Sequence, residues 1–197
     1  MAVTLDQIKT LRARTGVGIG NCKKALEESK GDFDKAVEYL RKQGIAKAAK
    51  RADKSAAEGT IGVYLHATKK VCAVVELNCE TDFAAKSEDF ISLAYDFAMQ
   101  VAAMDPEYKD RDSVPADVVE KEKDIYRAEL KKSGKPDNLV EKILDGKLNK
   151  FYEANCLMEQ AFIKDDSKTM EDHLNEAIAK LGERVEVGQY ARLTVGN

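Results

Sequence analysis

The sequence predicts an α+β protein in which a small helical module precedes a mixed core. Apolar residues recur at helical spacing through the first 54 residues. They then follow a period of two from Ile61 to Leu65 and, after a turn predicted at 68–70, from Val71 to Leu77. A second alternating stretch covers 185–195, and helical spacing returns between the two. We therefore expect about three antiparallel strands with helices on one face of the sheet.

Residues 1–44 predict a module of three short helices. Thr4 and Gln7 form a capping box ahead of the first helix, and Asn21 is suited to cap the second. Asp32 is suited to cap the third helix. Three helices of about ten residues each enclose a very small core, so we expect the module to gain stability by docking on another part of the molecule.

Residues 45–58 form a basic stretch that we expect to be a helical linker between the module and the core. Its apolar positions continue the helical spacing, while the other faces carry Lys47, Lys50, Arg51 and Lys54. This surface is either a solvated linker or a contact for an acidic partner or phosphate. The charge changes at the same place, because residues 1–54 carry 13 basic and 7 acidic residues and the remainder is acidic.

The core is predicted in two pieces, 59–114 and 154–197. Its first strand places Ile61, Val63 and Leu65 on one face. After a second strand, a long helix presents a wide apolar stripe, made by Phe90, Leu93, Ala94, Phe97, Ala98 and Val101. The last strand is expected to place five apolar residues on one face, namely Val185, Val187, Ala191, Leu193 and Val195.

Residues 115–153 are predicted to form an antiparallel helical hairpin inserted in the core. Pro115 is suited to the first turn of one helix, and a breaker sequence at 133–136 separates it from the next. Helices joined by so short a turn run antiparallel. Both are rich in Lys and Glu, so we expect them to project from the core rather than to be buried in it.

Composition argues against several classes of protein. The chain has 32 basic and 35 acidic residues, which is unlike a protein that coats nucleic acid. No apolar run approaches the roughly 20 residues of a membrane span, and the segment after Met1 does not resemble a secretory leader, so we expect a cytoplasmic protein. The four cysteines form no C-x-x-C pair, and we expect no metal site. His173 is expected to be solvated on a polar helix face.

An enzyme is considered and not favoured. Cys79 and Glu80 are close in sequence, and His66 could approach them across the sheet, but nothing defines the geometry of a nucleophile and its base. The glycine-punctuated run 15–20 follows no strand and lacks the Lys-Ser/Thr of a phosphate-binding loop. We therefore expect no enzymatic activity, no catalytic residue and no cofactor.

The segment 78–83 is the most informative candidate for a binding site. It lies between a strand and a long helix, where loops commonly carry function. Phe83 is either a core residue beneath this loop or, together with Asp82, a group presented to a partner. An aromatic ring supplies burial at a binding hot spot, and a carboxylate supplies directed charge.

Three runs of residues carry a resemblance to a known family. They are L-R-A-R-T-G-V-G at 11–18, C-K-K-A-L at 22–26 and N-C-E-T-D-F at 78–83. The first two closely resemble the amino-terminal module of the elongation factor Ts family, and the third resembles its T-D-F signature. The breaker at 133–136 and its flanking helices resemble the family's coiled-coil hairpin, so the resemblance extends in order over essentially the whole chain.

The resemblance implies guanine-nucleotide exchange on elongation factor Tu, with release of GDP during translation elongation. It implies an amino-terminal module similar to ubiquitin-associated (UBA) domains that docks on the GTPase. The partner is expected in its GDP-bound and nucleotide-free forms, with no direct contact to nucleic acid or membrane. Seven contact residues are carried over by motif, namely Arg12, Ile19, Lys23, Arg51, Thr81, Asp82 and Phe83. Asp82 and Phe83 are expected to act as a wedge that dislocates the GTPase's Mg²⁺.

The chain also departs from the family pattern. Longer members have two related core subdomains, whereas this chain has room for one. The resemblance suggests that short members restore the missing surface by self-association, so a homodimer is among the expected partners. Gly20 stands where many relatives have a bulky apolar residue, which puts a contact there in doubt. Ala84 and Ala85 are smaller than usual for the family.

Two other functions remain open at the level of sequence. A ubiquitin-like-binding or chaperone-associated adaptor would use the helical module of residues 1–44 alone. RNA binding would use the basic segment 1–54, but that segment lacks the interleaved aromatic residues on which bases stack.

Overall fold

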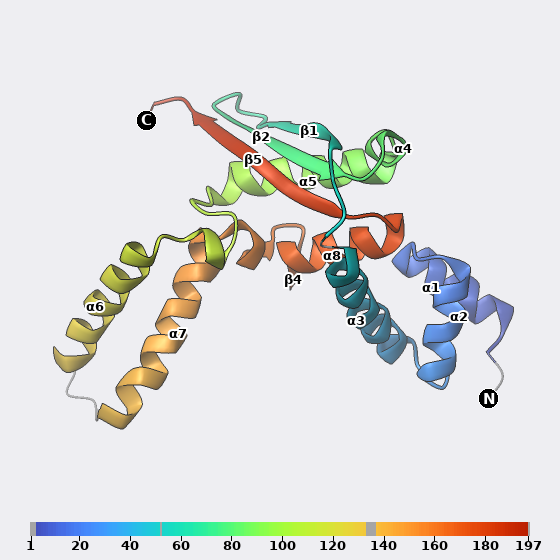
Figure 1. Ribbon diagram of the computed structural model, residues 1–197, viewed down its shortest axis with the longest axis horizontal. Coiled ribbons are helices and arrows are strands. Elements are labelled where there is room, and N and C mark those ends of the chain that lie inside the picture. The colour runs from blue at the N-terminus through green and yellow to red at the C-terminus, as the bar shows by residue number, and fades with distance from the viewer. Residues whose placement is uncertain (1–2, 52, 133–136, 197) are drawn as a thin grey trace.

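The computed structural model describes residues 3–51, 53–132 and 137–196 of the chain. In Figure 1 these residues form an arch, with a sheet and its covering helices at the top and two helical arms below. One arm consists of α1 (Leu5–Thr15), α2 (Ile19–Glu28) and α3 (Phe33–Arg51), and the other of α6 (Ala116–Lys132) and α7 (Asp137–Asn155). The predicted mixture of helices and antiparallel sheet is confirmed.

The amino-terminal arm encloses its own small core. The capping box of Thr4 and Gln7 at the start of α1 is confirmed, and Asp32 caps α3 by accepting two backbone N–H bonds at 3.1 Å. The prediction that Asn21 caps α2 is wrong. The backbone N–H of Cys22 already donates to the carbonyl of Gly18, so the helix begins before Asn21.

The third helix is much longer than the sequence pattern suggested. α3 runs unbroken for 19 residues, so the predicted short helix and the first part of the basic linker are one helix. The predicted boundary after Gly44 falls inside it. Gly44 lies against α8 (Met170–Leu181), where an added Cβ would stand 3.1 Å from the Asn175 carbonyl oxygen. α3 continues because nothing breaks it and because Ala48, one turn later, packs on the core of the mixed domain.

The core is a three-stranded antiparallel sheet with helices on one face. Its strands are β1 (Glu58–Leu65), β2 (Val71–Cys79) and β5 (Val185–Thr194), in the order β1-β2-β5. The central strand buries Ala73, Val75 and Leu77 against α5 (Glu88–Met104) and α8. All six residues of the predicted α5 stripe are buried.

The predicted face of the last strand is wrong beyond Val187. A β-bulge places Gly188 and Gln189 of β5 opposite Glu76 of β2, because Leu77 pairs with Val187 and Val75 with Tyr190. The extra residue exchanges the two faces of the strand. Val185 and Val187 therefore point into the core, whereas three residues after the bulge point out from the sheet, namely Ala191, Leu193 and Val195.

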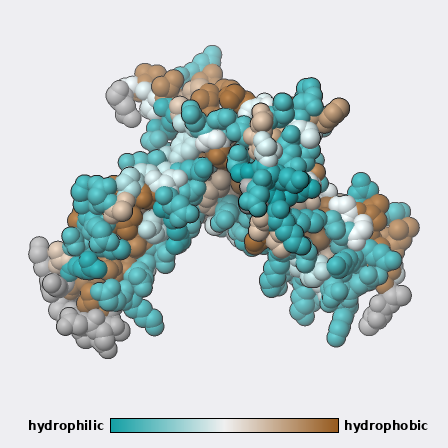
Figure 2. Space-filling view, in the orientation of Figure 1, coloured by the Kyte–Doolittle hydropathy of each residue, from teal (hydrophilic) through white to brown (hydrophobic). Residues whose placement is uncertain are grey.

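The outer face of the sheet is largely apolar, and none of the described elements covers it. Figure 2 shows apolar residues gathered at the upper edge of the molecule, where β5 ends beside the β1–β2 turn. We call this surface the outer sheet face, and its large exposed apolar residues are Ile61, Val63, Leu65, Val74, Leu193 and Val195.

The second arm is attached to the core by a compact polar contact at its base. Arg111 in a 3-10 turn (Arg111–Ser113) donates two 2.7 Å hydrogen bonds to Glu159 in another (Leu157–Glu159). Its guanidinium also lies 4.8 Å from the centre of the Tyr152 ring on α7. The two helices of the arm pack on each other, and Lys147 forms an ion pair with Glu129 between them. The predicted turn at 133–136 lies outside the described residues.

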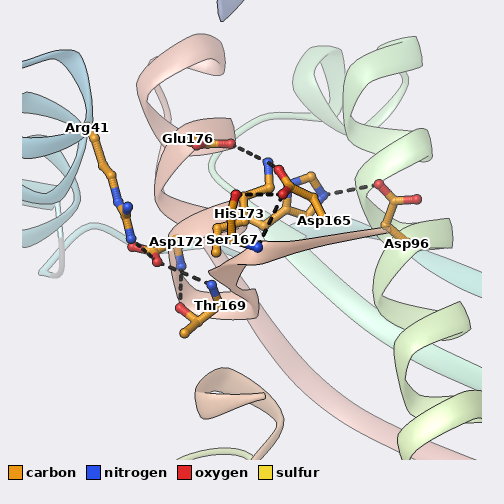
Figure 3. Close-up of polar contacts among 9 residues, drawn as sticks. Arg41, Asp96, Asp165, Ser167, Thr169, Asp172, His173 and Glu176 are labelled. Atoms are coloured by element: carbon orange, nitrogen blue, oxygen red, sulfur yellow. Dashed lines mark hydrogen bonds and ion pairs between the residues drawn. The ribbon is translucent and has the colours of Figure 1, made fainter. Parts of the chain in front are cut away.

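Polar contacts join α8 to both α3 and α5, as Figure 3 shows. Arg41 of α3 forms a bidentate ion pair with Asp172, which also belongs to the capping box of Thr169. The expectation that His173 is solvated is wrong. Its Nε2 atom lies 3.1 Å from Asp96 of α5, and its ring stacks on Phe162, because this side of α8 faces the core helix rather than water.

The short hairpin β3 (Ala161–Phe162) and β4 (Asp165–Thr169) precedes α8. Lys164 in its turn donates to Asp96 at 2.6 Å. Burial by itself raises the pKa of Asp96, but the hydrogen bonds from His173 and Lys164 outweigh it and leave that pKa below its ordinary value. Among the described residues, no helix is long and apolar enough to cross a membrane.

Candidate partner-binding site

Phe83 is the most exposed large apolar residue that the structure describes. It belongs to α4 (Asp82–Ala85), a single helical turn between β2 and α5, and it retains 83% of its accessible surface. The interpretation of Phe83 as a core residue beneath a loop is therefore wrong. The chain turns into α4 at Thr81, so that Ala85 rather than Phe83 meets the core. An exposed aromatic ring has surface available for burial against a partner.

Asp82 precedes the exposed ring and is ionised at neutral pH. Its Oδ2 atom accepts a 2.7 Å hydrogen bond from Lys86, one turn later, and the Asp82 side chain remains about half exposed at 49%. That bond holds the pKa of Asp82 below its ordinary value of 3.8. The single turn of α4 thus presents a carboxylate and an exposed apolar ring on consecutive residues.

Thr81 was predicted to contact a partner, but its polar groups are used inside the molecule. Its backbone N–H and its hydroxyl both donate to Glu183, at 3.1 Å and 2.7 Å. The same hydroxyl oxygen accepts from the backbone N–H of Ala84 and so caps α4. Thr81 therefore orients the turn that carries Phe83.

Arg51 was also predicted as a partner contact, and it likewise pairs within the chain. Its Nη1 atom lies 2.5 Å from Oε1 of Glu80, and the same oxygen accepts the backbone N–H of Arg184 at 2.6 Å. The N–H of Arg184 and the guanidinium of Arg51 hold the pKa of Glu80 below its ordinary value of 4.5. The end of α3 is thereby attached to the residue that begins the turn before α4.

The other predicted contacts lie on the solvent side of the amino-terminal arm. Ile19 at the start of α2 is 50% exposed, and Arg12 on α1 is exposed without an ion pair to any described residue. Lys23 lies 3.8 Å from Glu27, in an exposed pair of the kind that contributes little to stability. In Figure 1, α1, α2 and α4 all lie on the right of the molecule, away from α6 and α7.

The sequence reasoning did not identify Glu183 or Lys86 as part of this site. Lys86 could have been found, because it lies four residues after Asp82 and such pairs meet on a helix. Glu183 could not, because it contacts Thr81 across 102 positions of sequence and no local pattern connects the two.

The geometry does not support a cysteine nucleophile in this region. Cys79 pairs with Glu58 at one end of the β1–β2 ladder, whereas His66 follows the pair of Leu65 and Cys72 at the other end. The Cys79 thiol donates to the Thr81 carbonyl, and burial raises its pKa above the ordinary value of 9.0. A thiol in this state is a poor nucleophile at neutral pH. Within the described residues, no cluster of His, Cys, Asp and Glu side chains could hold a metal ion.

Comparison with known proteins identifies the family. The model of the family described as elongation factor TS matches residues 20–197. Elongation factor Ts of Thermosipho melanesiensis is 56% identical over 194 residues, which cover 98% of this chain and 99% of the relative. The elongation factors Ts of Moorella thermoacetica and Geobacter sulfurreducens are 54% and 48% identical and align over 96% and 91% of their own lengths, and over 98% and 100% of this chain. The chain therefore belongs to the elongation factor Ts family of translation elongation factors.

Proposed function

We propose that this chain is a guanine-nucleotide exchange factor that binds elongation factor Tu and promotes GDP release during translation elongation in the cytoplasm. The observation that carries this proposal is the exposure of Phe83 beside the ionised carboxylate of Asp82, on a turn attached to the rest of the core at Glu80 and Thr81. An aromatic ring in this position offers a partner a large apolar surface to bury.

The mechanism we propose is differential binding. An exchange factor has to bind the nucleotide-free GTPase more tightly than the GDP-bound form, and only this difference in affinity shifts the population toward the empty state. By linkage, bound nucleotide weakens the binding of the factor by the same ratio. Free GTP then occupies the empty site and displaces the factor.

Phe83 and Asp82 would have separate roles in this mechanism. Insertion of the Phe83 ring between switch elements of the GTPase would displace a side chain that packs there in the GDP-bound form. The Asp82 carboxylate would perturb the surroundings of the GTPase's Mg²⁺ through its negative charge. Neither role forms or breaks a covalent bond, so we propose that the chain is not an enzyme in its own right.

The amino-terminal arm would contribute affinity for the GTPase and would not displace its switch elements. We infer that its three helices form a UBA-like module whose exposed residues Arg12, Ile19 and Lys23 dock on the nucleotide-binding domain of the GTPase. The exposure of Arg12 and Ile19 supports this role. Arg51 and Thr81, which pair within the chain, would contribute by positioning the site rather than by direct contact.

The test is the release of labelled GDP from purified elongation factor Tu, with and without this chain, in excess unlabelled nucleotide. We expect substoichiometric amounts of the chain to accelerate release, because each molecule is displaced and acts again. A release rate that is unchanged at every concentration of the chain would refute the proposal. The adaptor alternative predicts instead a ubiquitin-like partner whose binding is indifferent to Phe83→Ala.

We also propose that the chain forms a homodimer through the outer sheet face. Six large apolar residues are exposed there on one side of a sheet that is covered by helices only on the other. A second copy would cover the same face around a two-fold axis. Sedimentation should give a dimer for the natural chain and a monomer for Val63→Lys, and a natural chain that stays monomeric at high concentration would contradict the proposal.

A further inference from the structure

Two turns of the core are joined by hydrogen bonds that run in both directions. Glu183, in the turn between α8 and β5, accepts the backbone N–H and the hydroxyl of Thr81 at 3.1 Å and 2.7 Å. In return, Glu80 accepts the backbone N–H of Arg184 at 2.6 Å. Each of two adjacent turns thus supplies a carboxylate to the backbone of the other.

The bond to Glu183 determines how the Thr81 hydroxyl can cap α4. A hydroxyl has one hydrogen to donate and two lone pairs that accept. Because the hydrogen is directed at Glu183, a lone pair is free for the backbone N–H of Ala84, which lies at 3.2 Å. Without Glu183, the Thr81 side chain keeps only the bond from the Ala84 N–H, so the orientation of the N-cap of α4 is fixed less firmly.

The position of Phe83 depends on this cap more than on its own contacts. The ring is 83% exposed, so packing of the side chain contributes little to holding it in place. Its location therefore follows from the backbone of α4, which is only four residues long. A helix of one turn is not stable by itself, because fixing the backbone of the first turn costs more free energy than its hydrogen bond contributes.

The fold itself has less need of Glu183. The register of β2 against β5 already brings the two turns together, because Cys79 pairs with Val185 directly beside them. Ala85 is buried in the core and holds the far end of α4. The bonds from Glu183 to Thr81 therefore add orientation at the start of α4, where Asp82 and Phe83 lie.

We propose that Glu183 is a positioning residue for Phe83, acting through the Thr81 cap to present the ring to the partner GTPase in one geometry. This inference rests on the exchange function proposed above. A ring presented in one geometry loses less conformational freedom on binding than one on a disordered turn. Loss of Glu183 therefore weakens the displacement step without removing any group that touches the partner.

The test is a double-mutant cycle between Glu183→Ala and Phe83→Ala, read as stimulated GDP release from elongation factor Tu. We expect Glu183→Ala to slow release about tenfold in the natural background, and to change nothing further when Phe83 is already alanine. Glu183→Gln should be intermediate, because its amide retains one accepting oxygen of the two that Thr81 uses.

A matched control is Glu159→Ala, which also removes a carboxylate that accepts two hydrogen bonds, here from Arg111 at the base of the second arm. Its effect on release should be the same with and without the Phe83 ring. Hydrogen exchange of the free chain gives a readout without the GTPase. Glu183→Ala should speed exchange at the Thr81 and Ala84 amides while the amides of β2 keep their protection.

The outcomes separate this inference from the function on which it rests. Release by Glu183→Ala at the natural rate, or a slowing that persists in full in the Phe83→Ala background, overturns the positioning role alone. Unchanged protection at Thr81 and Ala84 overturns it as well. If Phe83→Ala itself leaves stimulated release unchanged, the displacing role of Phe83 and the positioning role of Glu183 are overturned together. The exchange function is overturned only if the natural chain does not accelerate GDP release at any concentration.

Discussion

Replacement of Phe83 by alanine should reduce exchange activity while leaving the free protein folded. The ring is 83% exposed in the free chain, so its removal takes away little buried surface. We expect the free energy of unfolding to change by no more than about 0.5 kcal/mol, as for other exposed positions.

The expected loss of activity follows from burial of the same ring in the complex. Full burial of a Phe side chain contributes about 1.5–3 kcal/mol. If that burial occurs only when the switch elements are displaced, its loss raises the barrier to GDP release by the same amount. The stimulated rate should then fall roughly ten- to hundredfold.

The assay is stopped-flow release of a fluorescent GDP analogue, with thermal unfolding of each variant measured in parallel. A matched control is Ile125→Ala, which also removes an exposed apolar side chain, 57% accessible, from α6 on the opposite arm. The control should keep the natural rate. A folded Phe83→Ala variant that stimulates release as fast as the natural chain would refute the reasoning.

Three further predictions concern other parts of the molecule. Arg12→Ala should weaken the complex with the GTPase without lowering the melting temperature, since its side chain forms no ion pair with the described residues; equal affinity would remove Arg12 from the interface. Gly62→Ala should destabilise the chain by about 1–3 kcal/mol in urea unfolding, because the added Cβ would stand 2.1 Å from the Ala94 carbonyl oxygen; an unchanged midpoint would contradict this packing. The third prediction concerns pH. Because the pKa of Glu80 is lowered in the folded state, the stability that its carboxylate contributes is complete above the ordinary pKa of 4.5 and is lost as the pH falls below that value. The unfolding free energies of the natural chain and of Glu80→Gln should therefore converge as the pH falls below that value. A difference between the two free energies that does not change with pH would argue against a lowered pKa of Glu80.

Elements encoded by neighbouring residues were the ones that the sequence predicted well. The capping box at Thr4 depends on residues three positions apart, and the α5 stripe depends on helical spacing alone. The switch to alternation at Ile61 likewise located the first strand. Such local signals were sufficient for the fold class and for most of its elements.

Three of the errors depend on distant contacts. The bulge at Gly188 exchanges the faces of β5, and it is visible only in the pairing of β5 with β2. His173 has a polar sequence context but meets Asp96 across 77 positions of sequence. The continuous α3 is held by Gly44 packing on α8, which no helix-forming preference reveals.

The candidate site was predicted in part, and mainly through resemblance. The spacing of apolar residues left a buried Phe83 open, whereas the resemblance of the motif at 78–83 implied a ring presented to a partner, and the ring is exposed. The same motif gave no indication of Glu183, which orients the turn from another part of the chain. The exposed side chains of the candidate site were thus easier to predict from sequence than the residues that hold them in place.

The central claim is that this chain binds an empty GTPase in preference to a loaded one. The most direct test is titration of the chain against nucleotide-free elongation factor Tu and against its GDP complex, by calorimetry in the same buffer. We expect affinity for the empty form to be at least about tenfold higher, a difference of about 1.4 kcal/mol. Equal affinity for the two forms would contradict the account.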